Sequence, residues 1–198
     1  MRRSSFFLFV FYIISLLYAP TCFAAEPLSI AILPVINQTN THDEAVENVI
    51  LEALHAKFRT SLSSIVPIYQ LIPDNDVSTA LPPDIHKRPY SLKFEPTMLK
   101  DVANRLHADI VIGAVITNLR ELTFTSWTGD PIQQTNLSIR LVVYKTSEQE
   151  YIDIHDYKDY VGERMTFSDA DYLAKIIMDR LMSDLTFRDQ FLIITGKD

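Results

Sequence analysis

The stretch "SIAILPVINQTNTHDEAVENVI", from Ser29 to Ile50, joins an apolar segment to a polar loop and then to an amphipathic segment. Residues 28–36 are nearly all apolar and rich in Ile and Val, which is typical of a strand covered on both faces. Pro34 lacks a backbone N–H and therefore favours a sheet edge or a bulge. Thr41 and Glu44 form a capping-box pattern that predicts the start of a helix. The stretch thus predicts a strand followed by a helix, as in an α/β fold.

The rest of the chain continues this alternation and then changes to consecutive strands. Apolar residues at three- and four-residue steps predict helices, and period-two alternation predicts strands. The expected order is a helix continuing to residue 62, a strand at 66–72, helices at 74–81 and 96–106, strands at 110–119, 136–145 and 151–160, a helix at 168–185 capped by Ser168, and a short strand at 191–195.

The connections between these elements predict the sheet. Helices between the early strands favour parallel pairing, whereas short turns between the strands at 110–119, 136–145 and 151–160 favour an antiparallel meander. We therefore expect an α/β fold with a mixed sheet. Its start is parallel, its C-terminal half is an antiparallel meander, and helices pack on it.

The first 24 residues are predicted to be a secretory signal peptide. They contain a basic start at Arg2 and Arg3, an apolar run over 6–18, and a small-residue cleavage site that ends at Ala24. Such a leader predicts a periplasmic or secreted protein. Two alternatives stay open: retention of the leader as a membrane anchor, and lipidation of Cys22. We expect membrane contact only in those two cases.

Cleavage after Ala24 would leave residues 25–198 as a single α/β domain with a Pro-rich excursion at 82–96. Loss of the two leader arginines would leave 16 basic against 25 acidic side chains, a net charge of −9. This acidic balance argues against a nucleic-acid surface, which needs clustered Lys and Arg. The remaining chain would contain no Cys, which excludes a disulfide, a thiol nucleophile and a thiolate metal site.

The loop at residues 37–40 lies where many α/β proteins bind phosphate. A phosphate cradle needs Gly for close backbone approach and usually a cation, and this loop has neither. We therefore expect Asn37 and its neighbours to shape a turn and cap the helix, with anion binding at Asn37 as the alternative. The four Gly of the chain fit no dinucleotide or P-loop pattern, so no cofactor is expected.

Three segments carry a resemblance to a group of envelope proteins. They are "IAILPVINQTN" at 30–40, "IPDNDVSTAL" at 72–81 and "LKDVANRLHADIVIGAVITNL" at 99–119. The chain resembles the group that includes the curli secretion lipoprotein CsgG, the peptidoglycan-synthase activator LpoB and the amino-terminal domain of TolB. The resemblance implies a lipoprotein-like α/β envelope domain that works by contacting other proteins and has no catalytic residues.

Aromatic residues next to turn signals are the candidate contact residues. "ELTFTSWTGDPIQQ" places Phe124 and Trp127, the single Trp of the chain, at an expected hairpin tip. Tyr90 lies in the Pro-rich excursion. Exposed aromatic side chains of this kind are typical of protein-binding surfaces. The alternative is that Trp127 folds back and covers the sheet.

We therefore expect a non-catalytic protein-binding or assembly module of the cell envelope, without a metal site. The alternative is a small-ligand-binding or metal-dependent hydrolytic domain that uses Asp153 and His155, which share one face of a predicted strand. A third alternative is homo-oligomerisation through the sheet edge near Pro34.

Overall fold

The computed structural model describes residues 27–59, 69–82, 94–165 and 168–185. The elements are the strands β1 (Leu28–Ile32), β2 (Ile36–Asn37), β3 (Tyr69–Leu71), β4 (Ile110–Thr125), β5 (Pro131–Lys145) and β6 (Glu150–Glu163), and the helices α2 (Glu44–Arg59), α3 (Asp74–Ala80), α4 (Pro96–Leu106) and α5 (Ala170–Asp184).

The strands form one mixed sheet in the order β3-β1-β4-β5-β6, and β2 also pairs with β4. Strand β1 is parallel to β3 and β4, whereas β4, β5 and β6 form an antiparallel meander. The expected fold class is confirmed. Three predictions concern segments outside the described residues: the leader at 1–24, most of the excursion at 82–96, and the strand at 191–195. Over the described ranges, no helix has the length and apolar character that a membrane crossing requires.

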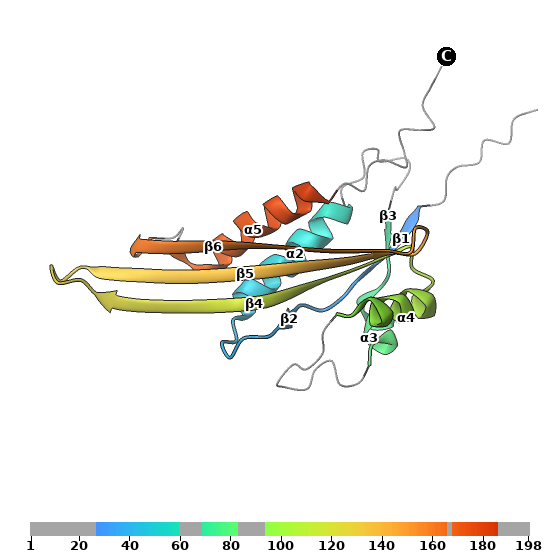
Figure 1. Ribbon diagram of the computed structural model, residues 1–198, viewed down its shortest axis with the longest axis horizontal. Helices are drawn as coiled ribbons and strands as arrows, with labels where there is room; N and C mark the ends of the chain where they lie inside the picture. Colours follow the sequence, from blue (N-terminus) through green and yellow to red (C-terminus); the bar gives the residue numbers. More distant parts are fainter. Residues whose placement is uncertain (1–26, 60–68, 83–93, 166–167, 186–198) are drawn as a thin grey trace, which may run out of the picture.

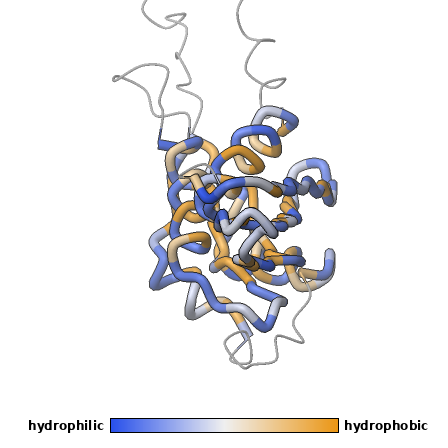
Figure 2. The backbone as a smooth tube through the Cα atoms, turned by 90° about the vertical axis from the view of Figure 1, so that its left-hand side faces the viewer, coloured by the Kyte–Doolittle hydropathy of each residue, from blue (hydrophilic) through white to orange (hydrophobic). Residues whose placement is uncertain are grey.

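Alternate side chains of the central strands enter two separate cores. Ile110 and Ile112 of β4 pack in the core under α2 and α5, whereas Val111 and Val115 pack in the core under α3 and α4. The two pairs of helices lie on opposite faces of the sheet, and apolar residues line the space between the layers (Figures 1 and 2). Because both faces are covered here, the strands are apolar at almost every position.

The break between β1 and β2 is a bulge at Pro34. Ile32 pairs with Ile112, but Ile36 pairs with Val115, so the β1–β2 side holds one residue more than β4 between these two pairs. Leu33 still donates to the Ile112 carbonyl at 2.8 Å, and the extra residue falls beside Pro34, which has no N–H to donate. Of the sheet edge and the bulge that Pro34 favours, the pairing shows the bulge.

The cap of α2 differs from the expected capping box. The Asp43 Oδ1 atom accepts the backbone N–H groups of Ala45 and Val46 at 2.9 and 3.2 Å. The Thr41 carbonyl instead accepts hydrogen bonds within the preceding loop. Thr41 was wrong as the cap because Asp43 lies one position before the helix and reaches its free donors directly.

Phe94 covers the α4 face of the sheet next to Gly113. The Phe94 side chain is fully buried, and a Cβ atom added at Gly113 would lie 2.6 Å from its Cε2 atom. The missing side chain at Gly113 therefore makes room for an aromatic ring on the sheet.

A polar network ties the same region to the outer strands. Asp153 of β6 accepts hydrogen bonds from Arg140 of β5 at 2.7 and 2.5 Å. Tyr151 donates to the Phe94 carbonyl at 3.2 Å and also contacts Arg140. Arg140 holds the pKa of Asp153 below its ordinary value. The ion pair therefore helps to fix the register of β5 against β6.

Gly113→Ala is expected to lower the free energy of unfolding by about 1–3 kcal/mol, because the new methyl group overlaps the Phe94 ring. Urea denaturation measures the loss. The matched control is Phe94→Leu: in that background, Gly113→Ala should cost clearly less. An equal cost in both backgrounds would show that Phe94 is not what Gly113 accommodates.

Asp153→Asn is expected to lower the free energy of unfolding at pH 7 by roughly 0.5–1 kcal/mol, a value reduced for the partial exposure of the pair. The pKa of Asp153 is lowered in the folded state, so its contribution is present at neutral pH and is lost as the pH falls below about 4. The difference between wild type and variant should thus shrink in acid.

Lys158→Ala serves as the control for Asp153→Asn, because Lys158 is an exposed charged residue on the same strand and lies away from the Asp153–Arg140 pair. A pH-independent loss for Asp153→Asn, or an equal loss for Lys158→Ala, would contradict the assigned ion pair.

Candidate functional site

The outer halves of β4, β5 and β6 continue beyond α3 and α4 as a three-stranded ribbon. We call this part the distal ribbon; it comprises residues 118–125, 131–138 and 157–163, which are paired in register. It projects to the left in Figure 1, away from α3 and α4. Each strand is longer than predicted, because the alternation of side chains continues past Leu119 and Tyr160 and begins before Asn136.

One face of the distal ribbon packs against α5. Leu119 and Leu137 are buried there, and Thr135 donates to the Ser168 carbonyl at 2.7 Å. Ser168 itself donates to Gln133 at 3.0 Å and so joins the end of the ribbon to the start of α5. Ser168 was predicted as the helix cap, but Asp169 occupies the N-cap position.

The opposite face of the distal ribbon exposes large apolar side chains. We call this surface the open ribbon face and define it by four residues, whose exposed fractions are 40% for Leu122, 46% for Phe124, 64% for Tyr157 and 64% for Val161. Leu122 and Val161 flank Gln134 across the three strands, so they lie in one row. No described helix covers this face (Figure 1).

The hairpin tip between β4 and β5 presents Trp127 on an ordered turn. Ser126 donates to the Asp130 carbonyl at 2.8 Å, and Thr128 donates to the Asp130 carboxylate at 2.7 Å. Gly129 has a φ of +95°, which only Gly adopts without strain. The Trp127 side chain is 98% exposed and does not cover the sheet. Trp127 and Phe124 therefore share one end of the molecule, whereas Tyr90 lies outside the described residues.

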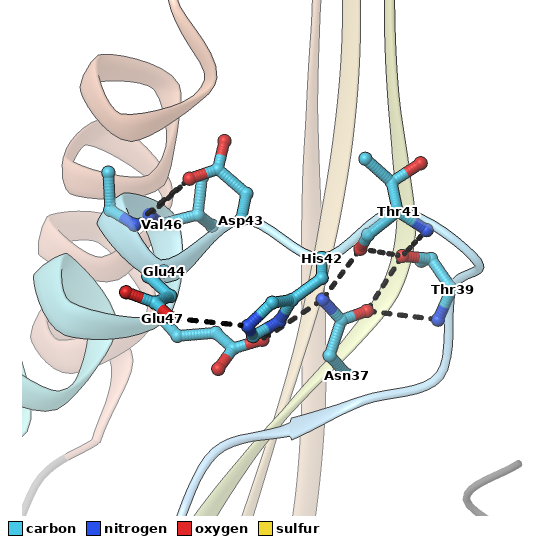
Figure 3. Close-up of polar contacts among 9 residues, drawn as sticks. Asn37, Thr39, Thr41, His42, Asp43, Glu44, Val46 and Glu47 are labelled. Atoms are coloured by element: carbon cyan, nitrogen blue, oxygen red, sulfur yellow. Dashed lines mark hydrogen bonds and ion pairs between the residues drawn. The ribbon is translucent and has the colours of Figure 1, made fainter. Parts of the chain in front are cut away.

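Asn37 has a different place, inside the loop before α2. Its side chain is 2% exposed. Its Nδ2 atom donates to the Thr41 carbonyl and to Glu47 at 2.9 and 3.1 Å, and its Oδ1 atom accepts the N–H and hydroxyl groups of Thr39 at 3.0 and 2.7 Å (Figure 3). All of its hydrogen-bonding positions are occupied within the chain. Asn37 therefore shapes the loop, as the turn interpretation expected.

Asp153 and His155 are on one face of β6, as the alternation predicted, but Asp153 is already bound by Arg140. Within the described ranges, no three His, Cys, Asp or Glu side chains come together in a way that could hold a metal ion. The arrangement of Asp153 thus corresponds to an ion pair between strands.

Sequence reasoning missed Leu122, Tyr157 and Val161 as candidate contact residues. Leu122 and Phe124 alternate with Thr in "RELTFT", and this period-two signal could have extended the strand past Leu119. Val161 lies one residue beyond the predicted end of the strand at 151–160. The exposure of these side chains depends on which face the helices cover, and no local pattern contains that information.

No family model matches the chain, and no curated protein matches its sequence. Similar solved structures include the lipoprotein GNA1162 from Neisseria meningitidis, with 13% identity, coverage of 79% of this chain and 99% of that chain, and a TM-score of 0.47. The PelC dodecamer from Paraburkholderia phytofirmans has 14% identity, coverage of 80% of this chain and 89% of that chain, and a TM-score of 0.41.

The C-terminal domain of LpoB from Escherichia coli is also similar, with 13% identity, coverage of 69% of this chain and 83% of that chain, and a TM-score of 0.34. LpoB is one of the proteins named for the group that the sequence resembles. At these identities and TM-scores we draw neither a family nor a function from the likeness.

Proposed function

We propose that this chain is a non-catalytic module of the cell envelope that binds a protein partner through the open ribbon face and Trp127. The proposed location, periplasmic or secreted, is supported by the signal-peptide pattern of residues 1–24. The proposed contact surface is supported by the geometry of the distal ribbon.

The exposed Trp127 at the end of a sheet face that exposes four large apolar side chains is the observation that carries this proposal. Isolated exposed apolar residues are common on protein surfaces and need no explanation. Here Leu122, Phe124, Tyr157 and Val161 share one face of the ribbon, and Trp127 stands at its end. Exposed aromatic side chains such as Phe124 and Trp127 dominate the energetics of many protein interfaces.

The hydrogen-bonded turn adds to the argument because it fixes the backbone that carries Trp127 before binding. Two hydrogen bonds to Asp130 close the turn, and β4 and β5 are paired up to Thr125 and Pro131. A partner that buries Trp127 would therefore lose little freedom of the loop on binding. A side chain that served only the fold would instead be expected to lie against the sheet.

The polar groups that first suggested chemistry support a non-catalytic role. The amide of Asn37 is bound within its loop, and the carboxylate of Asp153 is bound by Arg140. In this arrangement, neither the Asn37 amide nor the Asp153 carboxylate is free to bind a substrate or a metal.

Trp127→Ala combined with Phe124→Ala is expected to weaken binding of the partner at least tenfold, because it removes the two aromatic anchors. Retention of proteins from an envelope extract of the native host on the immobilised mature chain, followed by titration of the retained protein, measures the effect. The high exposure of Trp127 implies little effect of its removal on the fold.

Tyr172→Ala is the matched control, because Tyr172 is an aromatic residue on α5 that is 44% exposed and lies outside the open ribbon face. Its partner affinity should equal that of the wild type. Equal affinity of the double variant and the wild type would overturn the assigned surface, and light scattering would show whether the retained protein is a second copy.

The mature protein from its native host is expected to start at Ala25, because the cleavage-site pattern ends at Ala24. Intact-mass measurement checks this. A mass that includes residues 1–24, or one that includes a lipid on Cys22, would contradict cleavage after Ala24 and indicate a membrane-attached form.

A further inference from the structure

The two outer strands of the distal ribbon differ in how their edges are protected. At the middle of β6, the Tyr157 N–H donates to the Asp156 carboxylate at 2.8 Å, and the Tyr157 carbonyl accepts from Arg180 of α5 at 3.3 Å. The Arg180 Nε atom also lies 2.8 Å from the Asp156 carboxylate. This ion pair occupies backbone groups that an added strand would need, which is a known way to block a sheet edge.

The edge of β4 has no such cover in the described chain. Strand β2 pairs with β4 only at Val115 and Ile116, and Gln38 then donates to the Ile116 carbonyl at 2.9 Å. From Asn118 to Thr125, β4 pairs with β5 alone, and every side chain except Leu119 is exposed. Over these eight residues, the backbone donors and acceptors that do not bond to β5 therefore form one row along an accessible edge.

The surroundings of this edge differ on its two sides. Leu122 and Phe124 belong to the open ribbon face, so an added strand would meet apolar side chains there. On the α5 side, the Glu121 carboxylate accepts the Ala170 N–H at 3.1 Å, which places Glu121 beside Asp169 and Asp171. Burial raises the pKa of Glu121, the hydrogen bond from Ala170 lowers it, and the charges of Asp43, Asp169 and Asp171 raise it further.

We propose that the β4 edge from Asn118 to Thr125 binds an extended segment of the protein partner as an added strand, and that this segment alternates apolar residues with Lys or Arg. The inference rests on the proposed function. Successive side chains of a strand point to opposite faces. The apolar ones therefore meet the open ribbon face, and the basic ones meet the carboxylates on the α5 side. Backbone pairing supplies affinity, and the charge complementarity supplies selectivity.

Fluorescence anisotropy with short labelled peptides tests this pairing. The probe is an eight-residue peptide of alternating Val and Lys, added to the mature chain. It should bind at least tenfold more tightly than a peptide of alternating Val and Glu. Two further Val–Lys peptides carry N-methyl groups, one on every Val and the other on every Lys. Each keeps the charge but loses half of its backbone donors. The peptide whose methyl groups block the donors that face β4 should bind at least tenfold more weakly than the unmodified peptide.

Protein variants locate the bound peptide. Asp169→Asn combined with Asp171→Asn should weaken binding of the Val–Lys peptide at least tenfold. The matched control is Asp159→Asn combined with Glu163→Gln, which removes two charges from β6 and should leave binding unchanged. Circular dichroism and urea denaturation confirm that both variants are folded.

Three results would overturn the inference: no binding of the Val–Lys peptide, equal binding of both N-methylated peptides and the unmodified one, or equal weakening by the two pairs of substitutions. These results are distinguishable from failure of the proposed function. If the peptide does not bind but Trp127→Ala with Phe124→Ala still loses the partner, only the β4 edge is excluded. If those aromatic substitutions leave partner retention unchanged, the proposed surface itself fails.

Discussion

Pairing along β4 is the interaction on which the rest of this structure depends. This one strand is parallel to β1 and β2 on one side and antiparallel to β5 on the other. In the first part of β4, alternate side chains pack into the two cores on opposite faces of the sheet. The bulge at Pro34 accommodates the extra residue between β1 and β2 in their pairing with β4. The absence of a side chain at Gly113 of β4 makes room for the ring of Phe94.

The length of β4 relative to the helices creates the exposed surface. All four described helices pack on the sheet, but α3 and α4 contact only the end at which β1 and β3 lie (Figure 1). Beyond them, the distal ribbon is covered by α5 on one face and is open on the other. A sheet with one covered face normally alternates apolar and polar side chains. Leu122, Phe124, Tyr157 and Val161 break that rule on the open face, and this departure is what suggests a partner.

Much of the fold follows from the spacing of apolar residues in the sequence and from the turn residues and Pro between the apolar segments. Apolar runs and polar turns predict the strands, and Pro96 and His107 mark the two ends of α4. The prediction of element boundaries fails where the local sequence is compatible with two boundaries. Thr41 and Asp43 are both good caps, and the hydrogen bonds of Asn37 to the loop decide between them through tertiary contacts. Arg120 and Glu121 resemble the end of a strand, yet β4 continues because β5 pairs with it across these positions.

The candidate site is less predictable than the fold for the same reason. Trp127 and Phe124 are visible in the sequence as aromatics near a turn, but Tyr157 and Val161, which lie on the same ribbon face as Phe124, come from another strand. Asp153 suits chemistry in the sequence, but in the sheet Arg140 of β5 reaches it diagonally and forms an ion pair with it. Exposure and pairing are properties of the assembled sheet, so a single sequence contains them only indirectly.

Amide hydrogen exchange of residues 25–198, measured by NMR, tests the central claim that the distal ribbon is an ordered extension with one open face. The account predicts that the β5 amides bonded across the ribbon at 132–137 exchange slowly, in the range of the β5 amides at 139–143, while the Trp127 indole N–H exchanges at the rate of a fully exposed group. Rapid exchange throughout 132–137, or a protected Trp127 indole, would contradict it.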